Sequence, residues 1–163
     1  MKDIDKLFDS ISETATFIAK KQEAIPICFA AKDNNLTEIP LVFRDQAEKE
    51  HTAFFLKQLF RRMQPDAVVC IMEARAWTAT PGEIQPDTDL IGSGHAKAPS
   101  YAKIKQRKPD DILVASLFTK DKTVTRTWNI KEYIDHREVG KMKEIQKEKG
   151  EDGGIFDFSD VFD

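Results

Sequence analysis

The chain has 163 residues, of which 40% are apolar and 33% are charged, and its formal net charge is −3. Eleven phenylalanines provide enough apolar bulk for a core, which excludes a wholly disordered chain. The slightly negative balance does not mark the whole surface as a nucleic-acid binder, and the length suffices for one domain without disulfide or metal staples.

The first elements are a helix and a hairpin. Residues 3–21 are predicted to form an amphipathic helix, because apolar side chains recur there at three- and four-residue steps. Strands are predicted at residues 25–31 and 36–43, and the Asp-Asn-Asn sequence at 33–35 favours a tight turn between them. One face of the second strand carries Ile39, Leu41 and Phe43.

A second helix is predicted after Asp45. Asp45 and Glu48 have the spacing of a helix-capping pair, and Pro65 ends the helix. We expect its apolar stripe to pack on the sheet, with the histidine packed and hydrogen-bonded within it. This stripe consists of His51, Phe55, Leu56, Leu59, Phe60 and Met63.

The remaining elements are mostly strands. A long strand is predicted at residues 66–79, and a second hairpin at 112–119 and 122–130. The proline- and glycine-containing connection 80–109 is far longer than a usual loop, so it is either functional or disordered. Residues 131–149 carry weak apolar points at helical spacing, which favours a helix there.

This order of elements predicts an α+β domain. The helix after the first hairpin is a crossover, so the strands on its two sides should be parallel. We therefore expect a mixed sheet of about five strands with helices mainly on one face. The predicted domain covers residues 1–149, and residues 150–163 form an acidic, phenylalanine-rich tail.

The two cysteines, Cys28 and Cys70, lie in apolar strand segments. They are expected to be small buried residues, and a disulfide would require that their strands be neighbours. The N-terminus lacks the apolar stretch of a signal peptide, and no apolar run approaches the roughly 20 residues that cross a bilayer. These features predict a cytoplasmic protein.

No catalytic or metal motif is complete. The order of elements resembles the start of zinc nucleoside deaminases, but Glu50-His51 reverses the required order and no cysteine pair follows. The histidines His51, His95 and His136 are scattered, and Gly92 to Lys97 lacks the ending of a phosphate-binding loop. We therefore expect no metal and no cofactor.

One strand face has an unusual composition. Glu73, Arg75 and Trp77 project from the same side of the predicted strand, and Arg126 and Trp128 would share that side if the last strands pair nearby. The alternative is a structural ion pair on a partly solvated sheet, with tryptophan at the core edge. The ligand-binding candidates are Glu73, Arg75, Trp77 and Arg126.

The long connection is basic at its end. No acid occurs between Asp89 and Asp110, so this stretch could follow a phosphate backbone and stack an aromatic ring on a base. The alternative is a solvated loop. The nucleic-acid-binding candidates are Lys97, Tyr101, Lys103, Lys105, Arg107 and Lys108.

The tail offers a third surface. Residues 150–163 combine a glycine-rich hinge, five acids and three closely spaced phenylalanines, Phe156, Phe158 and Phe162. Such an end resembles the acidic tips with which single-strand DNA-binding proteins contact partners. The alternative, which we favour, is that these rings dock on the domain itself, because exposed phenylalanines invite aggregation.

The stretch from Asp66 to Trp77, followed by Pro99-Ser100, Arg107 and a strand hairpin, resembles a known pattern. It is similar to small uncharacterised bacterial and phage-encoded α+β proteins, over residues 25–130. In those proteins an apolar strand ends Glu-Ala-Trp, whereas this chain inserts Arg75-Ala76. The resemblance implies a domain of unknown function and no catalytic residue.

These observations favour a small soluble protein that acts by binding rather than catalysis. One alternative is an enzyme that uses Glu73, Arg75 and the 80–109 loop on a small substrate. A second alternative is nucleic-acid binding through residues 97–108. An unknown protein partner would use the tail, and no membrane association is expected.

Overall fold

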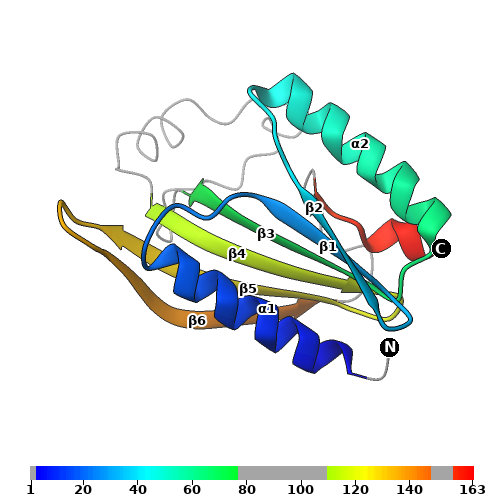
Figure 1. The fold of residues 1–163 in the computed structure, drawn as a ribbon, viewed down its shortest axis with the longest axis horizontal. Coiled ribbons are helices and arrows are strands. Elements are labelled where there is room, and N and C mark those ends of the chain that lie inside the picture. The colour runs from blue at the N-terminus through cyan, green and yellow to red at the C-terminus, as the bar shows by residue number, and fades with distance from the viewer. Residues whose placement is uncertain (1–2, 77–109, 148–155) are drawn as a thin grey trace, which may run out of the picture.

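The computed structural model describes residues 3–76, 110–147 and 156–163, with the backbone alone at 75, 76 and 110. Figure 1 shows two α-helices and a short C-terminal helix around one sheet of strands. The elements are α1 (Ile4–Ala19), β1 (Ile27–Lys32), β2 (Asn35–Pro40), α2 (Gln46–Met63), β3 (Ala67–Ala76), β4 (Asp110–Thr119), β5 (Thr123–Glu132), β6 (Arg137–Lys147) and the 3₁₀ helix η1 (Ser159–Phe162).

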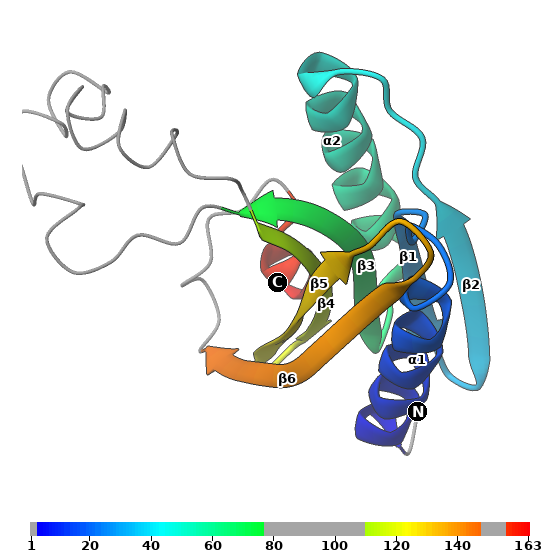
Figure 2. The ribbon, with the colours of Figure 1, turned by 90° about the vertical axis from the view of Figure 1, so that its left-hand side faces the viewer.

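The strands form one six-stranded sheet in the order β2-β1-β3-β4-β5-β6, strongly twisted from β2 to β6 (Figure 2). Every hydrogen-bonded pair is antiparallel. The predicted α+β class is confirmed, and the prediction of about five strands is roughly consistent with the six observed, but the prediction of a mixed sheet is wrong. The two strands that α2 connects, β2 and β3, do run in the same direction, but β1 lies between them and pairs antiparallel with both.

The two α-helices cover opposite faces of the sheet, so the prediction of helices mainly on one face is wrong. Phe8, Ile11 and Ala15 of α1 pack with the odd-numbered side chains of β3 and β4. Leu56 and Phe60 of α2 pack with the even-numbered ones, together with the C-terminal segment. The apolar strand residues alternate on both sides of β3, and each side therefore needs its own cover.

The second helix is capped as predicted but faces the sheet differently. Asp45 accepts a hydrogen bond from the backbone N–H of Glu48, and Gln64 ends the helix in a left-handed conformation. Its buried residues are Ala53, Leu56 and Phe60, which are spaced three and four apart. Leu59 and Met63 are half-buried.

Phe55 of α2 is 64% exposed, and His51 is also exposed. Their predicted packing is therefore wrong. The predicted stripe is wider than the face that one helix can pack on a sheet. Only Leu56, Leu59, Phe60 and Met63 of the stripe are buried or half-buried.

The described part of the segment 131–149, residues 131–147, does not contain the expected helix. Arg137–Lys147 form β6, the outer strand next to β5, and most of its side chains are exposed. Its weak apolar points lack the alternation of a buried strand, so pairing with β5 decides its conformation.

Candidate binding groove

Glu73 is fully engaged by other residues of the fold. Its Oε1 accepts a hydrogen bond from the backbone N–H of Ala24 at 3.0 Å, and its Oε2 accepts one from Nη2 of Arg137 at 2.8 Å. The side chains of Glu73 and Arg137 are each only 9% exposed. The hydrogen bond with Glu73 raises the pKa of the Arg137 guanidinium. This arrangement fits the structural alternative, in which the carboxylate joins the segment before β1 to the start of β6.

A hollow of about 100 Å³ lies beside this ion pair, with Glu23, Asp111 and Glu132 in its lining. Pockets that bind small molecules usually measure about 300–1,000 Å³. The hollow is therefore too small to enclose a substrate by itself.

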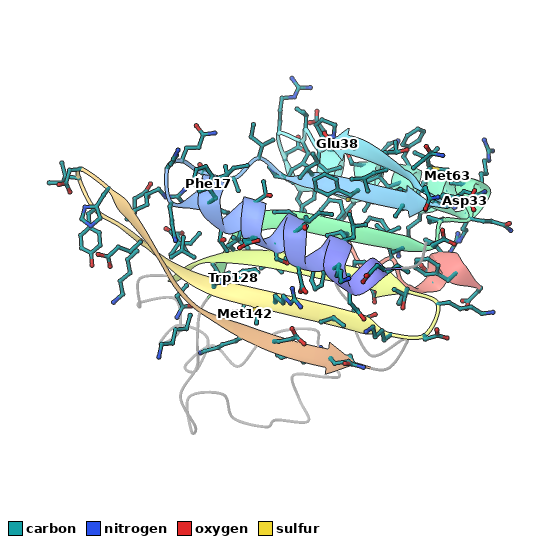
Figure 3. All side chains as sticks on the ribbon, turned by 60° about the horizontal axis from the view of Figure 1, so that its bottom comes forward. Phe17, Asp33, Glu38, Met63, Trp128 and Met142 are labelled. Carbon is teal, nitrogen blue, oxygen red and sulfur yellow. The ribbon has the colours of Figure 1, made fainter. Side chains whose placement is uncertain are left out.

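Arg126 lies on the same sheet face as Glu73 but is held by other partners. Its guanidinium bonds Asp9 of α1 at 2.7 Å and Glu144 of β6 at 2.8 Å, and it covers the ring of Phe8. Figure 3 labels Trp128 on the same sheet face beneath α1, where it is buried opposite Met142 of β6. Of the residues expected on one face, Glu73, Arg126 and Trp128 do share it, but Glu73 and Arg126 belong to separate ion-pair networks.

Several predicted site residues lie outside the described part of the chain. The backbone of Arg75 pairs with Asp111 in the β3–β4 ladder, and its side chain is not described. Trp77 and the basic candidates fall within 77–109. The predictions for Lys97, Tyr101, Lys103, Lys105, Arg107 and Lys108 thus remain predictions.

His136 lies in the turn between β5 and β6 rather than in a metal cluster. Its Nδ1 contacts Oδ1 of Asp135 at 2.7 Å, and its ring stacks on Tyr133. Within residues 3–76, 110–147 and 156–163, no three metal-binding side chains gather.

His136 should titrate above its ordinary pKa of 6.5, because the hydrogen bonds that its ring donates to Asp135 and then to Glu138 favour its protonated form. The folded-state pKa exceeds the unfolded value, so the stabilisation is complete below about pH 6.5 and is lost as pH rises through the folded-state pKa. The proton NMR titration of the ring should show this, and Asp135→Asn should lower the pKa. An unchanged titration in that variant would contradict the assignment.

The C-terminal segment docks on the domain, as favoured above. Phe158 is fully buried and meets the rings of Phe60 and Phe118 edge to face at 5.1 and 5.7 Å. Phe156 stacks on Phe43, and Phe162 is half-buried in the same cluster. Of the three rings proposed for a partner, Phe158 is therefore unavailable while the segment is docked.

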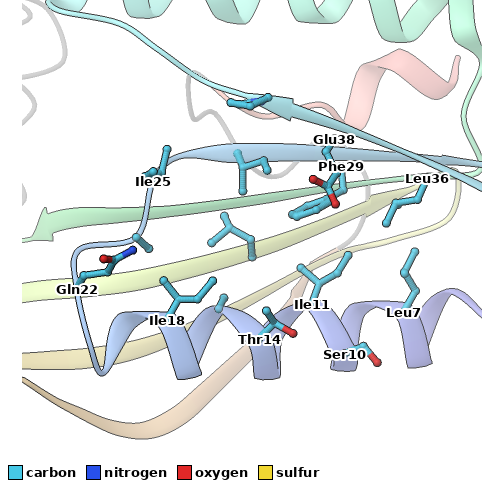
Figure 4. Close-up of a pocket in the computed structure, with 15 residues that line it drawn as sticks. Leu7, Ser10, Ile11, Thr14, Ile18, Gln22, Ile25, Phe29, Leu36 and Glu38 are labelled. Carbon is cyan, nitrogen blue, oxygen red and sulfur yellow. The ribbon is translucent and has the colours of Figure 1, made fainter.

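A groove of about 600 Å³ runs between α1 and the edge of the sheet formed by β1 and β2. Figure 4 shows Leu7, Ile11 and Ile18 of α1 facing Phe29 of β1 and Leu36 of β2 across it. Its volume lies in the usual range of ligand sites. The lining is mainly aliphatic, so this hollow is the strongest candidate site in the described part of the chain.

The groove exists because α1 does not cover the whole sheet. The helix packs most closely on β3, β4 and β6, and β1 and β2 extend beyond it. Small side chains, Thr14 and Ala15 on α1 and Ala24 before β1, leave room between the two layers. Leu36 remains 40% exposed and Ile25 66% exposed at the rim. Apolar surface that would normally be covered is thus open to a ligand.

Among the residues that the structure describes, β2 pairs only with β1, so its other edge is open beside the groove. Leu41 donates its backbone N–H to the carbonyl of Pro26, which sets the alternation of the β1–β2 ladder. By this alternation, the backbone groups of Leu36 and Glu38 point away from β1. The side chains of these two residues line the groove.

Sequence reasoning missed this site. The apolar spacing in α1 predicts an amphipathic helix but does not show that part of its apolar face stays open. The face predicted for the second strand, with Ile39, Leu41 and Phe43, packs under α2. The available signal was the opposite face of that strand, where Leu36, Glu38 and Pro40 alternate. A glutamate and a proline between apolar residues are unusual for a fully covered strand.

Within the residues that the structure describes, no helix is long and apolar enough to cross a membrane. The resemblance of residues 25–130 to small bacterial and phage-encoded proteins is neither supported nor contradicted by comparison with known proteins. No family model, no curated protein and no solved structure matches this chain.

Proposed function

We propose that this protein is a non-catalytic binding module that takes an extended peptide segment of another protein along β2. The segment adds a strand to the free edge of the sheet and places every second side chain in the groove under α1. The observation that carries this proposal is the double role of Leu36 and Glu38. Their backbone N–H and C=O groups point away from β1 in the plane of the sheet, and their side chains line the groove.

The chemistry of the lining favours a peptide over a lipid. Glu38 is the one charged side chain among the described residues that line the groove, so no cation there would hold the carboxylate or phosphate of a lipid. A peptide with aliphatic side chains at alternate positions and a lysine or arginine near Glu38 would satisfy both the apolar walls and the charge. Pro40 has no N–H, so Leu36 and Glu38 supply the outward donors of this part of β2.

The enzyme alternative has less support. Both oxygens of Glu73 already accept hydrogen bonds, and the adjacent hollow is one sixth of the groove's volume, about 100 against 600 Å³. The nucleic-acid alternative depends on residues 97–108, outside the described ranges.

The test is selection from a displayed library of random linear peptides, with the full chain as bait. Enriched peptides should carry apolar residues at every second position and a basic residue. Leu36→Asp should weaken binding of the best peptide about ten- to a hundredfold in calorimetry, because a buried aliphatic contact contributes about 1.5–3 kcal/mol. In NMR spectra of the complex, the amide protons of Leu36 and Glu38 should become protected from exchange.

The matched control is Val42→Asp, since Val42 follows β2, is 81% exposed and does not line the groove. Its affinity should equal that of the wild type. Equal weakening by both variants, or enrichment of peptides without alternation, would contradict strand addition at β2. If no peptide were enriched, but the wild type bound laurate and Leu36→Asp did not, the groove would be an apolar lipid site instead.

A further inference from the structure

Cys28 and Cys70 are opposite each other on adjacent strands. Cys28 of β1 is the register partner of Cys70 of β3, and their Sγ atoms lie 3.2 Å apart. Both are buried free thiols on the α2 face of the sheet. A disulfide between these cysteines requires that their strands be neighbours, and β1 and β3 are paired in the sheet.

The backbone geometry of this pair suits a covalent bond. The hydrogen bond from Leu41 N–H to the Pro26 carbonyl fixes the alternation along β1, so Cys28 directs its backbone groups toward β2. Cys28 and Cys70 therefore form a non-hydrogen-bonded pair, in which the Cα atoms approach to about 4.5 Å. Disulfides span Cα separations of about 4.4–6.8 Å. The bond can thus close without separation of the strands.

Burial keeps the pair reduced while the α2 face is covered. The hydrogen bond with Cys70 and burial raise the pKa of the Cys28 thiol, and the thiolate is the form that attacks a disulfide. The cover consists of α2 and the C-terminal segment, which share one apolar cluster with both cysteines. Oxidation therefore requires that part of this cover move.

In the described part of the chain, residues 156–163 are held on the domain by side-chain contacts. This segment is not a strand of the described sheet. The hydrogen bonds that the backbone N–H groups of Val161 and Ser159 donate, to the Phe158 carbonyl and to Oδ1 of Asp157, lie within the segment itself. The ring of Phe158 and an ion pair between Asp160 and Arg61 at 3.0 Å hold it on α2. A segment held by side chains opens more readily than a strand inside the sheet.

We propose that Cys28 and Cys70 form a redox site, which a low-molecular-weight disulfide oxidises to a cross-strand bond when residues 156–163 leave the α2 face. One cysteine thiolate attacks the reagent, forms a mixed disulfide and expels one thiolate. The second cysteine thiolate attacks the protein sulfur of the mixed disulfide, closes the bond and expels the second thiolate. The protein loses two electrons to the reagent and two protons to solvent.

The probe is dithiobis(nitrobenzoate), which releases one coloured thiolate at each step. Folded wild-type protein should release two equivalents slowly, and its mass should fall by two hydrogen atoms without an adduct. Cys70→Ala should release one equivalent and keep the adduct. Two stable adducts on the wild type, or no bond between the cysteines after complete reaction, would overturn the redox site.

The role of the segment is tested with two phenylalanine variants. Phe158 and Phe8 are both fully buried, but Phe8 belongs to α1 on the opposite face. The oxidation rates of the two variants are compared at denaturant concentrations at which equal fractions of each are unfolded. Under these conditions Phe158→Ala should be oxidised at least about tenfold faster than Phe8→Ala. This ratio corresponds to about 1.4 kcal/mol of opening free energy. Asp160→Asn, which leaves the core intact, should also accelerate it. Equal rates in the two phenylalanine variants, with no change in Asp160→Asn, would show that the segment does not control access.

Discussion

Replacing Phe158 with alanine should lower the free energy of unfolding by about 3–5 kcal/mol. The ring is fully buried between Phe60 and Phe118, so its removal creates a cavity and eliminates two aromatic contacts. For a chain of this length the melting temperature should fall by about 2–4 °C per kcal/mol. Deletion of residues 156–163 should destabilise the fold at least as much, since it also removes Val161 and the ion pair with Arg61.

The matched control is Phe55→Ala on the outer face of α2. Phe55 is largely exposed, so this variant should change stability by less than about 0.5 kcal/mol. Denaturant unfolding followed by far-ultraviolet circular dichroism measures both variants. If Phe158→Ala cost no more than Phe55→Ala, the C-terminal segment would not belong to the core.

Glu73→Ala should cost about 3–5 kcal/mol, because it leaves the buried guanidinium of Arg137 without its carboxylate. The loss has a second part, since the backbone N–H of Ala24 loses its acceptor. Nε and Nη1 of Arg137 have no hydrogen-bond partner among the described residues, and the largely exposed Glu132, whose Oε1 lies 3.6 Å from Nε, compensates only in part. The affected contacts join the α1–β1 connection to β3 and β6.

Two variants separate this buried pair from ordinary surface charges. Lys122→Ala breaks an ion pair with Asp5 on the surface, which should cost at most about 1 kcal/mol. The double variant Glu73→Leu with Arg137→Met should recover most of the loss, because apolar replacement of both partners removes the uncompensated charge. Urea unfolding of Glu73→Ala, Lys122→Ala and the double variant gives the three free energies of unfolding to compare. A double variant as unstable as Glu73→Ala would assign the loss to packing or to Ala24 instead of the charge.

The binding groove and the cysteine pair lie on opposite sides of β1. Phe29 points into the groove, and Cys28 points under α2. Neither cysteine lines the groove, so variants of one site leave the lining of the other unchanged. Failure of one proposal would therefore not count against the other.

The candidate site was less predictable from sequence than the helices. The pattern that places Leu7, Ile11 and Ile18 on one face of α1 is the same whether this face is covered or open. Which of them face a groove depends on where the helix crosses the sheet. Likewise, the residue pattern on β3 indicated Glu73, but its partner Arg137 is 64 positions away and belongs to a segment expected to be helical.

The sequence by itself determined the elements whose signals are local. Apolar residues at helical spacing place α1, and the same spacing with the cap Asp45 places α2, because these contacts join residues only three or four apart. The turn at Asp33 and Asn34, where Asp33 adopts positive φ, likewise places the first hairpin.

Only the tertiary structure decided how these elements meet. The insertion of β1 between β2 and β3, the strand conformation of β6 and the docking of Phe158 all depend on partners distant in sequence. Such pairings are selected by the total apolar surface that the assembled layers bury, and no short window of sequence contains that quantity. For the same reason, the open groove beside β2 could be recognised only when the position of α1 on the sheet was known.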